Sequence, residues 1–395
     1  MSRFRVALFL VLVVATSAHA RRRSVAAPGG TQFGVFPLHA VELTSDTSDL
    51  LPLRYTIGGA GIVALGDSTH GTHEFFTIKL RILDYLARER GFDVLSLEAP
   101  FPITERINVY AQGGPGDPRA LLYELHDRLA YLFWDVEELL EVIEWVRAYN
   151  AHRGDRPPIE IAGADVYDES GAVAGVLEYL RRTDPAAAAL AEEEYACVLA
   201  QDRTLSCERS AERVRDRLVA APADVLHYAD IVLQYFDGPR FEPRERNMAA
   251  NLLWIREHRG QSRRVIHWGH QEHVGKIRTA ATRGETMGSL LAAQLGRDYV
   301  ALGTLTGSGT FLQWNSNFVA EVQTYPDPPE GSYEWHMRHR GFAAMFVPLR
   351  GRDVPGSTFR TGGTLTGWIT VDQPLEQKLD GVIYIDRTTP TTPLR

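Results

Sequence analysis

Short apolar runs alternate regularly with longer segments of helical periodicity, and this alternation constrains the fold more than any other feature of the sequence. Residues 72–90 repeat apolar side chains every three or four positions and end before Gly91, as expected for an amphipathic helix with a glycine C-cap. Strands alternating with helices predict a three-layer α/β/α domain around a mainly parallel sheet. The expected strands are residues 61–66, 92–97, 159–162, 265–268, 299–302 and 382–385.

The organisation along the chain follows from these segments. We expect one α/β domain over residues 51–395, preceded by a flexible lead-in over residues 21–50. Residues 172–260 are mostly of helical character, and we interpret them as a helical insertion over the active-site edge of the sheet. Residues 350–380 are rich in Gly, Thr and Asp and are typical of a β-type excursion.

The N-terminus is typical of an export signal. Arg3 and Arg5 precede the apolar run 6–15, which is too short to span a bilayer as a helix, and residues 18–20 (AHA) form a small-x-small cleavage site. The three arginines at 21–23 favour the alternative of an uncleaved membrane anchor. We therefore expect a signal peptide over residues 1–20 and export to the periplasm or the outside of the cell.

Charge and cysteine content limit the partners and the redox chemistry. The 395 residues include 42 Lys and Arg against 50 Asp and Glu, a formal charge of −8 that disfavours binding to nucleic acid. Cys197 and Cys207 have no histidine or acidic motif around them that would make either a nucleophile. An oxidising compartment would allow a bridge between them, but two free thiols are an equal alternative.

Polar residues follow four of the expected strands at the point where each strand ends. Because ligands of open parallel sheets bind outside the carboxyl ends of the strands, we expect these side chains to share one cleft. They are Asp67, His70 and Glu74 after the first strand, Glu98 after the second, Asp165 after the third, and His270 and His273 after the fourth.

The motifs exclude several chemistries and favour one. No G-x-S-x-G elbow, Walker A loop or G-x-G-x-x-G turn follows a strand. Histidines and carboxylates without an obvious nucleophile suit direct activation of water. The same side chains could bind a divalent metal, since His70 and Glu74 are four residues apart and His270 and His273 three apart, although neither spacing matches H-E-x-x-H.

At these residues the sequence resembles the erythromycin esterase family. The resemblance covers about residues 55–390 and depends on the order and spacing of its motifs. These are LGDSTHG (65–71), LEA (97–99), GADV (163–166), RERNMAAN (244–251), WGHQEH (268–273) and DGVIYIDRTTP (380–390).

The resemblance implies a hydrolase that opens a carboxylic ester or lactone with water, uses no essential cofactor and acts on a small molecule such as a macrolide. His70 would be the general base, and Glu98 would orient it. The family usually has Glu in place of Asp67 and Arg in place of Lys79, which casts doubt on the macrolide as substrate. We assign catalysis to His70, Asp67, Glu74, Glu98 and His270, and substrate binding to His273, Arg244, Lys79 and Asp165.

Two alternatives stay open at this point. One is a metal-dependent hydrolase that uses the same histidines and carboxylates. The other is an exported protein that binds an apolar ligand in a cleft without turnover. Its support is the aromatic content of the chain, for example Tyr131, Phe133, Trp134, Tyr235 and Phe236, although such residues are more often part of a core. Neither alternative, nor the preferred one, calls for a nucleic acid or for stable membrane insertion once the signal is removed.

Overall fold

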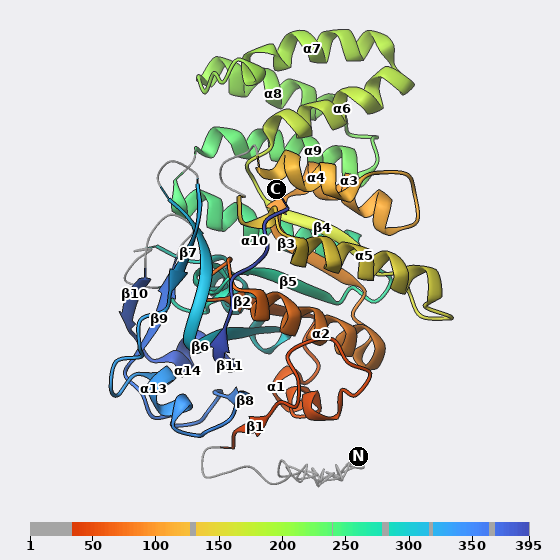
Figure 1. Ribbon diagram of the computed structural model, residues 1–395. Helices are drawn as coiled ribbons and strands as arrows, with labels where there is room; N and C mark the ends of the chain where they lie inside the picture. The colour runs from red at the N-terminus through yellow and green to blue at the C-terminus, as the bar shows by residue number, and fades with distance from the viewer. Residues whose placement is uncertain are drawn as a thin grey trace, which may run out of the picture.

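The computed structural model describes residues 34–394 apart from 127–131, 239, 279–283, 316–318 and 363–367. Its central sheet has nine strands, of which six are parallel and lie side by side (Figure 1). The predicted α/β class with a mainly parallel central sheet is therefore confirmed. In spatial order the six are β11 (Gly381–Thr388), β6 (Tyr299–Trp314), β2 (Ile62–Asp67), β5 (Val265–His270), β3 (Val94–Pro100) and β4 (Glu160–Asp165).

The sequence did not predict the antiparallel strands at the other edge. β8 (Ala344–Pro348) pairs with β11, β1 (Phe36–Pro37) pairs with β8, and β7 (Ala320–Thr324) folds back on the end of β6. Within the stretch 350–380, β9 (Thr358–Gly362) and β10 (Trp368–Asp372) form a separate two-stranded sheet.

Part of the expected flexible lead-in is packed onto the domain. Besides β1, the 3-10 turn η1 (Ser48–Leu50) is held by a buried ion pair between Asp49 and Arg81 of helix α2 (His73–Arg90), with Nη2 and Oδ1 2.6 Å apart. Residues 34–50 therefore belong to the folded body, because a buried guanidinium needs this carboxylate. Residues 21–33 lie outside the described part of the chain.

Helices cover both faces of the sheet, and each face has its own apolar core. Neighbouring residues of β2 alternate between them: Val63 and Leu65 face one core, and Ile62 and Ala64 face the other. The first core is covered by α1 (Leu53–Ile57), α2 (His73–Arg90), α3 (Phe101–Ala111), α4 (Pro118–His126) and α5 (Glu137–His152). The second is covered by α10 (Phe241–His258), α11 (Gln271–Val274), α12 (Met287–Leu295), α13 (Tyr333–Arg338) and α14 (Leu375–Lys378).

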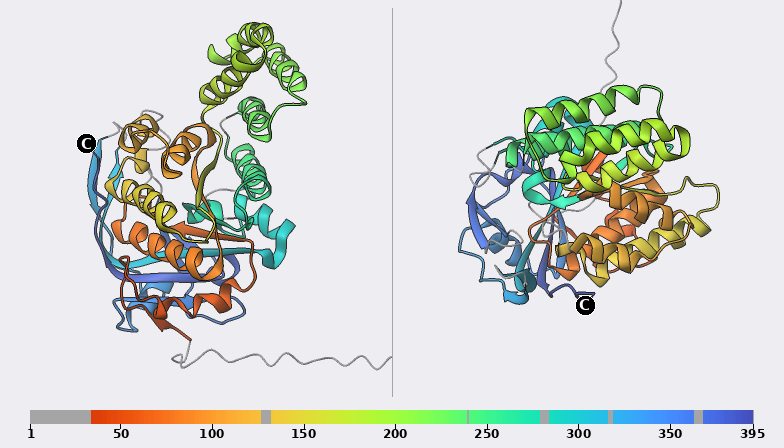
Figure 2. Two further views of the ribbon diagram at one scale, coloured as in Figure 1. Left: turned by 90° about the vertical axis from the view of Figure 1, so that its right-hand side faces the viewer. Right: turned by 90° about the horizontal axis from the view of Figure 1, so that it is seen from above.

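Four helices form a separate bundle beyond the β4 edge of the sheet, at the top of Figure 1 and at the upper right in the left view of Figure 2. The bundle has its own apolar core, and a disulfide between Cys197 and Cys207 joins two of its helices. The question of bridged or free thiols is thus settled. The helices are α6 (Glu169–Thr183), α7 (Pro185–Leu199), α8 (Leu205–Arg217) and α9 (Ala223–Gln234).

The stretch 172–260 is thus divided between two parts of the fold. Its last helix, α10, packs against β4 and β3 rather than joining the bundle, because its face with Met248, Leu252 and Ile255 completes the second core. None of the helices in the described ranges has the length and hydrophobicity needed to span a bilayer. The expected signal peptide, residues 1–20, lies outside these ranges.

Candidate active site

The polar strand ends meet at one edge of the sheet. β2, β5, β3 and β4 are consecutive parallel strands, so their carboxyl ends lie next to one another. The last residue of β2 is Asp67, that of β5 is His270 and that of β4 is Asp165, while Glu98 lies near the end of β3. All four side chains are buried.

Asp67 holds His70 on one oxygen and Lys79 on the other. Its Oδ1 lies 3.0 Å from Nδ1 of His70, outside the angular range of a regular hydrogen bond, and its Oδ2 accepts a hydrogen bond from the Lys79 ammonium. Burial raises the pKa of Asp67, but the charges of Lys79 and His70 lower it more, so the net pKa is below its usual value. Lys79, expected to bind substrate, is a buried counter-ion instead, only 3% exposed.

The second ring nitrogen of His70, Nε2, has no hydrogen-bond partner among the residues that the structure describes. Within the described ranges nothing makes a hydrogen bond to Nε2, and the residue is 7% exposed. Phe133, in the short 3-10 turn η2 (Leu132–Trp134), stacks on the imidazole with the ring centroids 3.8 Å apart and the planes 11° apart. An imidazole with a carboxylate oxygen 3.0 Å from Nδ1, and with no hydrogen-bond partner on Nε2 among the described residues, has the arrangement of a general base.

His270 is held in one neutral tautomer by backbone groups. Its Nε2 donates to the carbonyl oxygen of Gly362 at 2.8 Å, and its Nδ1 accepts from the N–H of Glu272 at 3.2 Å. Burial, and then the neighbouring His70, lower the pKa of His270 to about 4. The rings of His270 and His70 lie 5.0 Å apart between centroids, so the fixed imidazole of His270 lies beside His70.

Glu98 is the centre of a second cluster. Its Oε2 accepts from the backbone N–H of His270 at 2.7 Å, and its Oε1 accepts from Nη2 of Arg244 at 2.9 Å. Nε of Arg244 also donates to Oδ1 of Asp165 at 3.0 Å, and its Nη2 donates to the other carboxylate oxygen. Gly269 makes room for this arrangement, since a Cβ there would lie 3.0 Å from Oε2 of Glu98.

His273 lies in the same cluster between two carboxylates and the guanidinium of Arg244, whose Nη1 is 3.1 Å from its Nε2. Its Nδ1 contacts Oε1 of Glu245, and its Nε2 lies 3.2 Å from Oε1 of Glu98. Burial lowers the pKa of His273, but the two carboxylates raise it to about 10. Although burial raises the pKa of Glu98, His273 and Arg244 hold it well below its usual value. His273, Arg244 and Asp165, all expected to bind substrate, are therefore engaged with one another.

Glu245 was missed in the sequence, although a signal for it exists. Met248, Leu252 and Ile255 follow it by three, seven and ten residues, so all four side chains lie on the same face of α10. A carboxylate on the buried face of an amphipathic helix requires a partner, and here it has two: His273 and the N–H of Met287, which donates at 2.7 Å.

Glu74, assigned to catalysis from the sequence, lies outside this cluster. Its two oxygens accept hydrogen bonds from the backbone N–H and from Oγ1 of Thr389, each at 2.8 Å. The reason is that α2 begins only at His73, so His70 precedes the helix and the four-residue spacing does not place Glu74 beside it.

The described side chains of the two clusters nearly balance in charge. Three are cations and four are carboxylates. The cations are Lys79, Arg244 and His273, and the carboxylates are Asp67, Glu98, Asp165 and Glu245.

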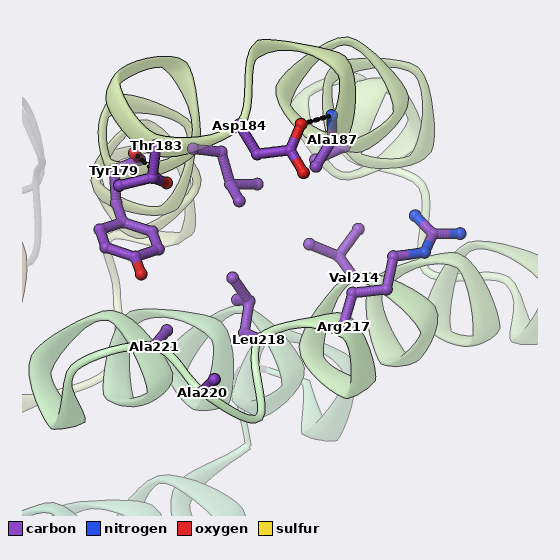
Figure 3. A pocket seen from close by; sticks show the side chains of 11 residues that line it. Tyr179, Thr183, Asp184, Ala187, Val214, Arg217, Leu218, Ala220 and Ala221 are labelled. Carbon is purple, nitrogen blue, oxygen red and sulfur yellow. Dashed lines mark hydrogen bonds between the residues drawn. The ribbon is translucent and has the colours of Figure 1, made fainter.

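Neither a metal site nor the hollow in Figure 3 adds to this cluster. In the described part of the chain no three His, Cys, Asp or Glu side chains are arranged to hold a metal ion. A hollow of about 180 Å³ lies among the helices of the bundle. Figure 3 shows both apolar and polar side chains around it, among them Val214, Leu218, Tyr179 and Asp184. It lies in the helical bundle and contains none of the site residues predicted from the sequence.

Comparisons with known proteins identify the family. Residues 87–393 match the family model described as erythromycin esterase. Erythromycin esterase type II of Escherichia coli is 24% identical over 397 residues, covering 86% of this chain and 92% of its own length. The protein YbfO of Bacillus subtilis (strain 168) is 23% identical over 402 residues and covers 88% of both chains.

Solved structures agree in fold. A protein of Bacillus cereus superposes with a TM-score of 0.81 at 24% identity, covering 91% of this chain and 97% of that one. A mutant erythromycin esterase in its open conformation superposes with a TM-score of 0.68 at 17% identity, covering 89% and 96%. With the family model matching most of its length, this chain belongs to the erythromycin esterase family of hydrolases.

Proposed function

We propose that this protein is an exported hydrolase that cleaves a carboxylic ester or lactone with a water molecule activated by His70, without a covalent intermediate. The observation that carries the proposal is the carboxylate of Asp67 at 3.0 Å from Nδ1, while Nε2 has no partner among the described residues. A water molecule hydrogen-bonded to Nε2 can give its proton to the imidazole as it attacks an acyl carbon.

The remaining steps use groups already in place. Attack of water on the acyl carbon forms a C–O bond, moves one proton to Nε2 of His70 and leaves a negative charge on the former carbonyl oxygen. We assign stabilisation of this oxyanion to Nε2–H of His270, which would exchange its present acceptor, the carbonyl oxygen of Gly362, for the oxyanion. When the tetrahedral intermediate collapses, the C–O bond to the alcohol breaks and His70 returns its proton to the leaving oxygen.

The substrate class follows from the relatives. Two proteins similar to this chain are named for erythromycin, so a macrolide lactone is the first substrate to test. Export is proposed on the basis of residues 1–20, and the disulfide between Cys197 and Cys207 is compatible with an oxidising compartment.

The test is hydrolysis by purified protein, measured by mass spectrometry. We expect erythromycin or a simple phenyl ester to gain the mass of one water, and expect His70→Asn to lose the activity while it still folds. In ¹⁸O-labelled water, a single turnover should place the label in the acid product without any acylated protein. Hydrolysis that persists in His70→Asn, or an acylated protein peak, would contradict the mechanism.

A further inference from the structure

Residues 389–394, which follow β11, run between the turn that carries His70 and the turn that carries Phe133. In Figure 1 they are the dark blue stretch that leaves β11 and ends beside α4. We propose that this segment, together with the side chains of Glu74 and Glu138, is a clasp that positions His70 against Phe133. The inference rests on the proposed function, because the clasp would act through the proposed base.

One side of the clasp holds the turn of His70. The N–H of Thr391 donates to the carbonyl of Gly71 at 3.0 Å, and the N–H of His73 donates to the carbonyl of Thr389 at 3.0 Å. Glu74 closes this side by accepting two hydrogen bonds from Thr389. The residue directly after His70 and the first turn of α2 are therefore fixed to the same segment.

The other side holds the segment that follows Phe133. The N–H of Leu394 donates to the carbonyl of Asp135 at 3.1 Å, and the N–H of Glu137 donates to the carbonyl of Thr392 at 2.8 Å. Trp134, next to Phe133, donates its indole N–H to the carbonyl of Glu98 at 2.8 Å. The chain that follows Phe133 is thus bonded to the clasp, and its neighbour Trp134 is bonded to the backbone of β3.

Glu138 joins the two sides. Both of its oxygens lie 3.1 Å from the N–H of Thr392, and Oε1 lies 2.8 Å from Nδ1 of His73. The hydrogen bond to Glu138 raises the pKa of His73, although burial opposes it. A single buried carboxylate on α5 therefore contacts the clasp segment and the start of α2.

Other contacts hold the turn of His70 without reaching Phe133. The hydroxyl groups of Thr69, Thr72 and Tyr325 form mutual hydrogen bonds of 2.6 to 2.9 Å. Gly71 lies so close to β6 that a Cβ would meet the carbonyl oxygen of Leu312 at 1.8 Å. These contacts fix the turn, whereas the clasp fixes the distance between the imidazole and the aromatic ring that covers it.

Because the clasp would position the proposed base, its loss is expected to affect kcat rather than substrate binding. A misplacement of about 1 Å at a reacting group can cost on the order of 100-fold in rate. Glu74 and Glu138 contact neither His70 nor its proposed water site, so they are positioning residues. We expect loss of the clasp to lower kcat at least about tenfold while KM changes less than about threefold.

The experiment compares Glu138→Gln and Glu74→Gln with Glu192→Gln. Glu192→Gln is a matched control because it makes the same change from carboxylate to amide. Glu192 lies in the helical bundle, where it forms an exposed ion pair with Arg181. Besides kcat and KM, amide hydrogen exchange is measured over residues 66–76 and 132–137. We expect faster exchange in both segments for the two clasp variants, unchanged exchange elsewhere, and no change for the control. If Glu138→Gln fails to fold, Thr389→Val removes only the hydroxyl contact with Glu74 and keeps the test available.

The outcomes separate the clasp from the proposed function. An unchanged kcat in folded clasp variants of an active, His70-dependent enzyme overturns the clasp alone. Exchange that rises uniformly along the chain also overturns it, because that pattern means general destabilisation. If the wild-type protein hydrolyses no ester, the proposed function fails, and the exchange data still decide whether the two turns are coupled.

Discussion

The two halves of the site lie at the same edge of the sheet but differ in what they leave unpaired. In the His70 half, made of Asp67, His70 and Lys79, one imidazole nitrogen has no partner among the described residues. In the Arg244 half, the charged groups contact one another: Glu98, Asp165, Arg244, Glu245 and His273. The first half is therefore suited to proton transfer, and the second to holding the strand ends in place.

The largest effect is expected from His70→Ala. Loss of a general base typically costs about 10²–10⁴-fold in rate, and we expect this loss in kcat/KM for ester hydrolysis. The variant should keep the wild-type urea midpoint to within a small shift, because His70 is not part of the Arg244 half. Full activity in His70→Ala would contradict the proposed functional difference between the two halves.

In the Arg244 half we expect a substitution to lower the stability of the fold rather than to act on the reaction directly. Arg244→Met leaves Glu98 and Asp165 with fewer counter-charges in a buried place, and breaking a buried ion pair on one side costs about 3–5 kcal/mol. The loss should appear as a lower urea midpoint. Arg244→Lys should lose less, since it keeps the charge but not the two-pronged contact with Asp165. A stable Arg244→Met protein with impaired kcat would place this residue in the reaction instead.

His273 sharpens the comparison through pH. Its pKa is raised to about 10 in the folded protein, against an ordinary value near 6.5, so its stabilising effect is complete below about pH 6.5 and is lost as the pH rises toward 10. The double variant Glu245→Gln, His273→Gln removes both members of the pair. We expect the stability advantage of the wild type over this variant to shrink by more than about 1 kcal/mol between pH 7 and pH 9. A constant difference, measured by urea unfolding, would mean that His273 is not a cation in the fold.

The smallest effect is expected from removal of divalent metal. The carboxylates of both halves are already bound by cations or N–H groups, so dialysis against a chelator should leave the rate within about twofold. A loss of activity that added zinc or magnesium restores would favour the metal-dependent alternative.

Much of the site could be predicted because it depends on local patterns and one topological rule. Parallel strands end at a common edge, and this rule brought Asp67, Glu98, Asp165 and His270 together from the positions of the apolar runs alone. Glu74 shows the limit of the same reasoning. The helical spacing that linked it to His70 applies only inside a helix, and α2 begins three residues after His70.

The sequence by itself determined the α/β class and the polar residues at the ends of the parallel strands, because periodicity and strand ends are local properties. The tertiary structure decided how these groups are paired. It placed Lys79 on Asp67, Glu245 on His273 and residues 389–394 across the turn of His70. These pairings join segments up to about 320 residues apart in the chain, and only packing of the complete fold brings such segments within hydrogen-bonding distance.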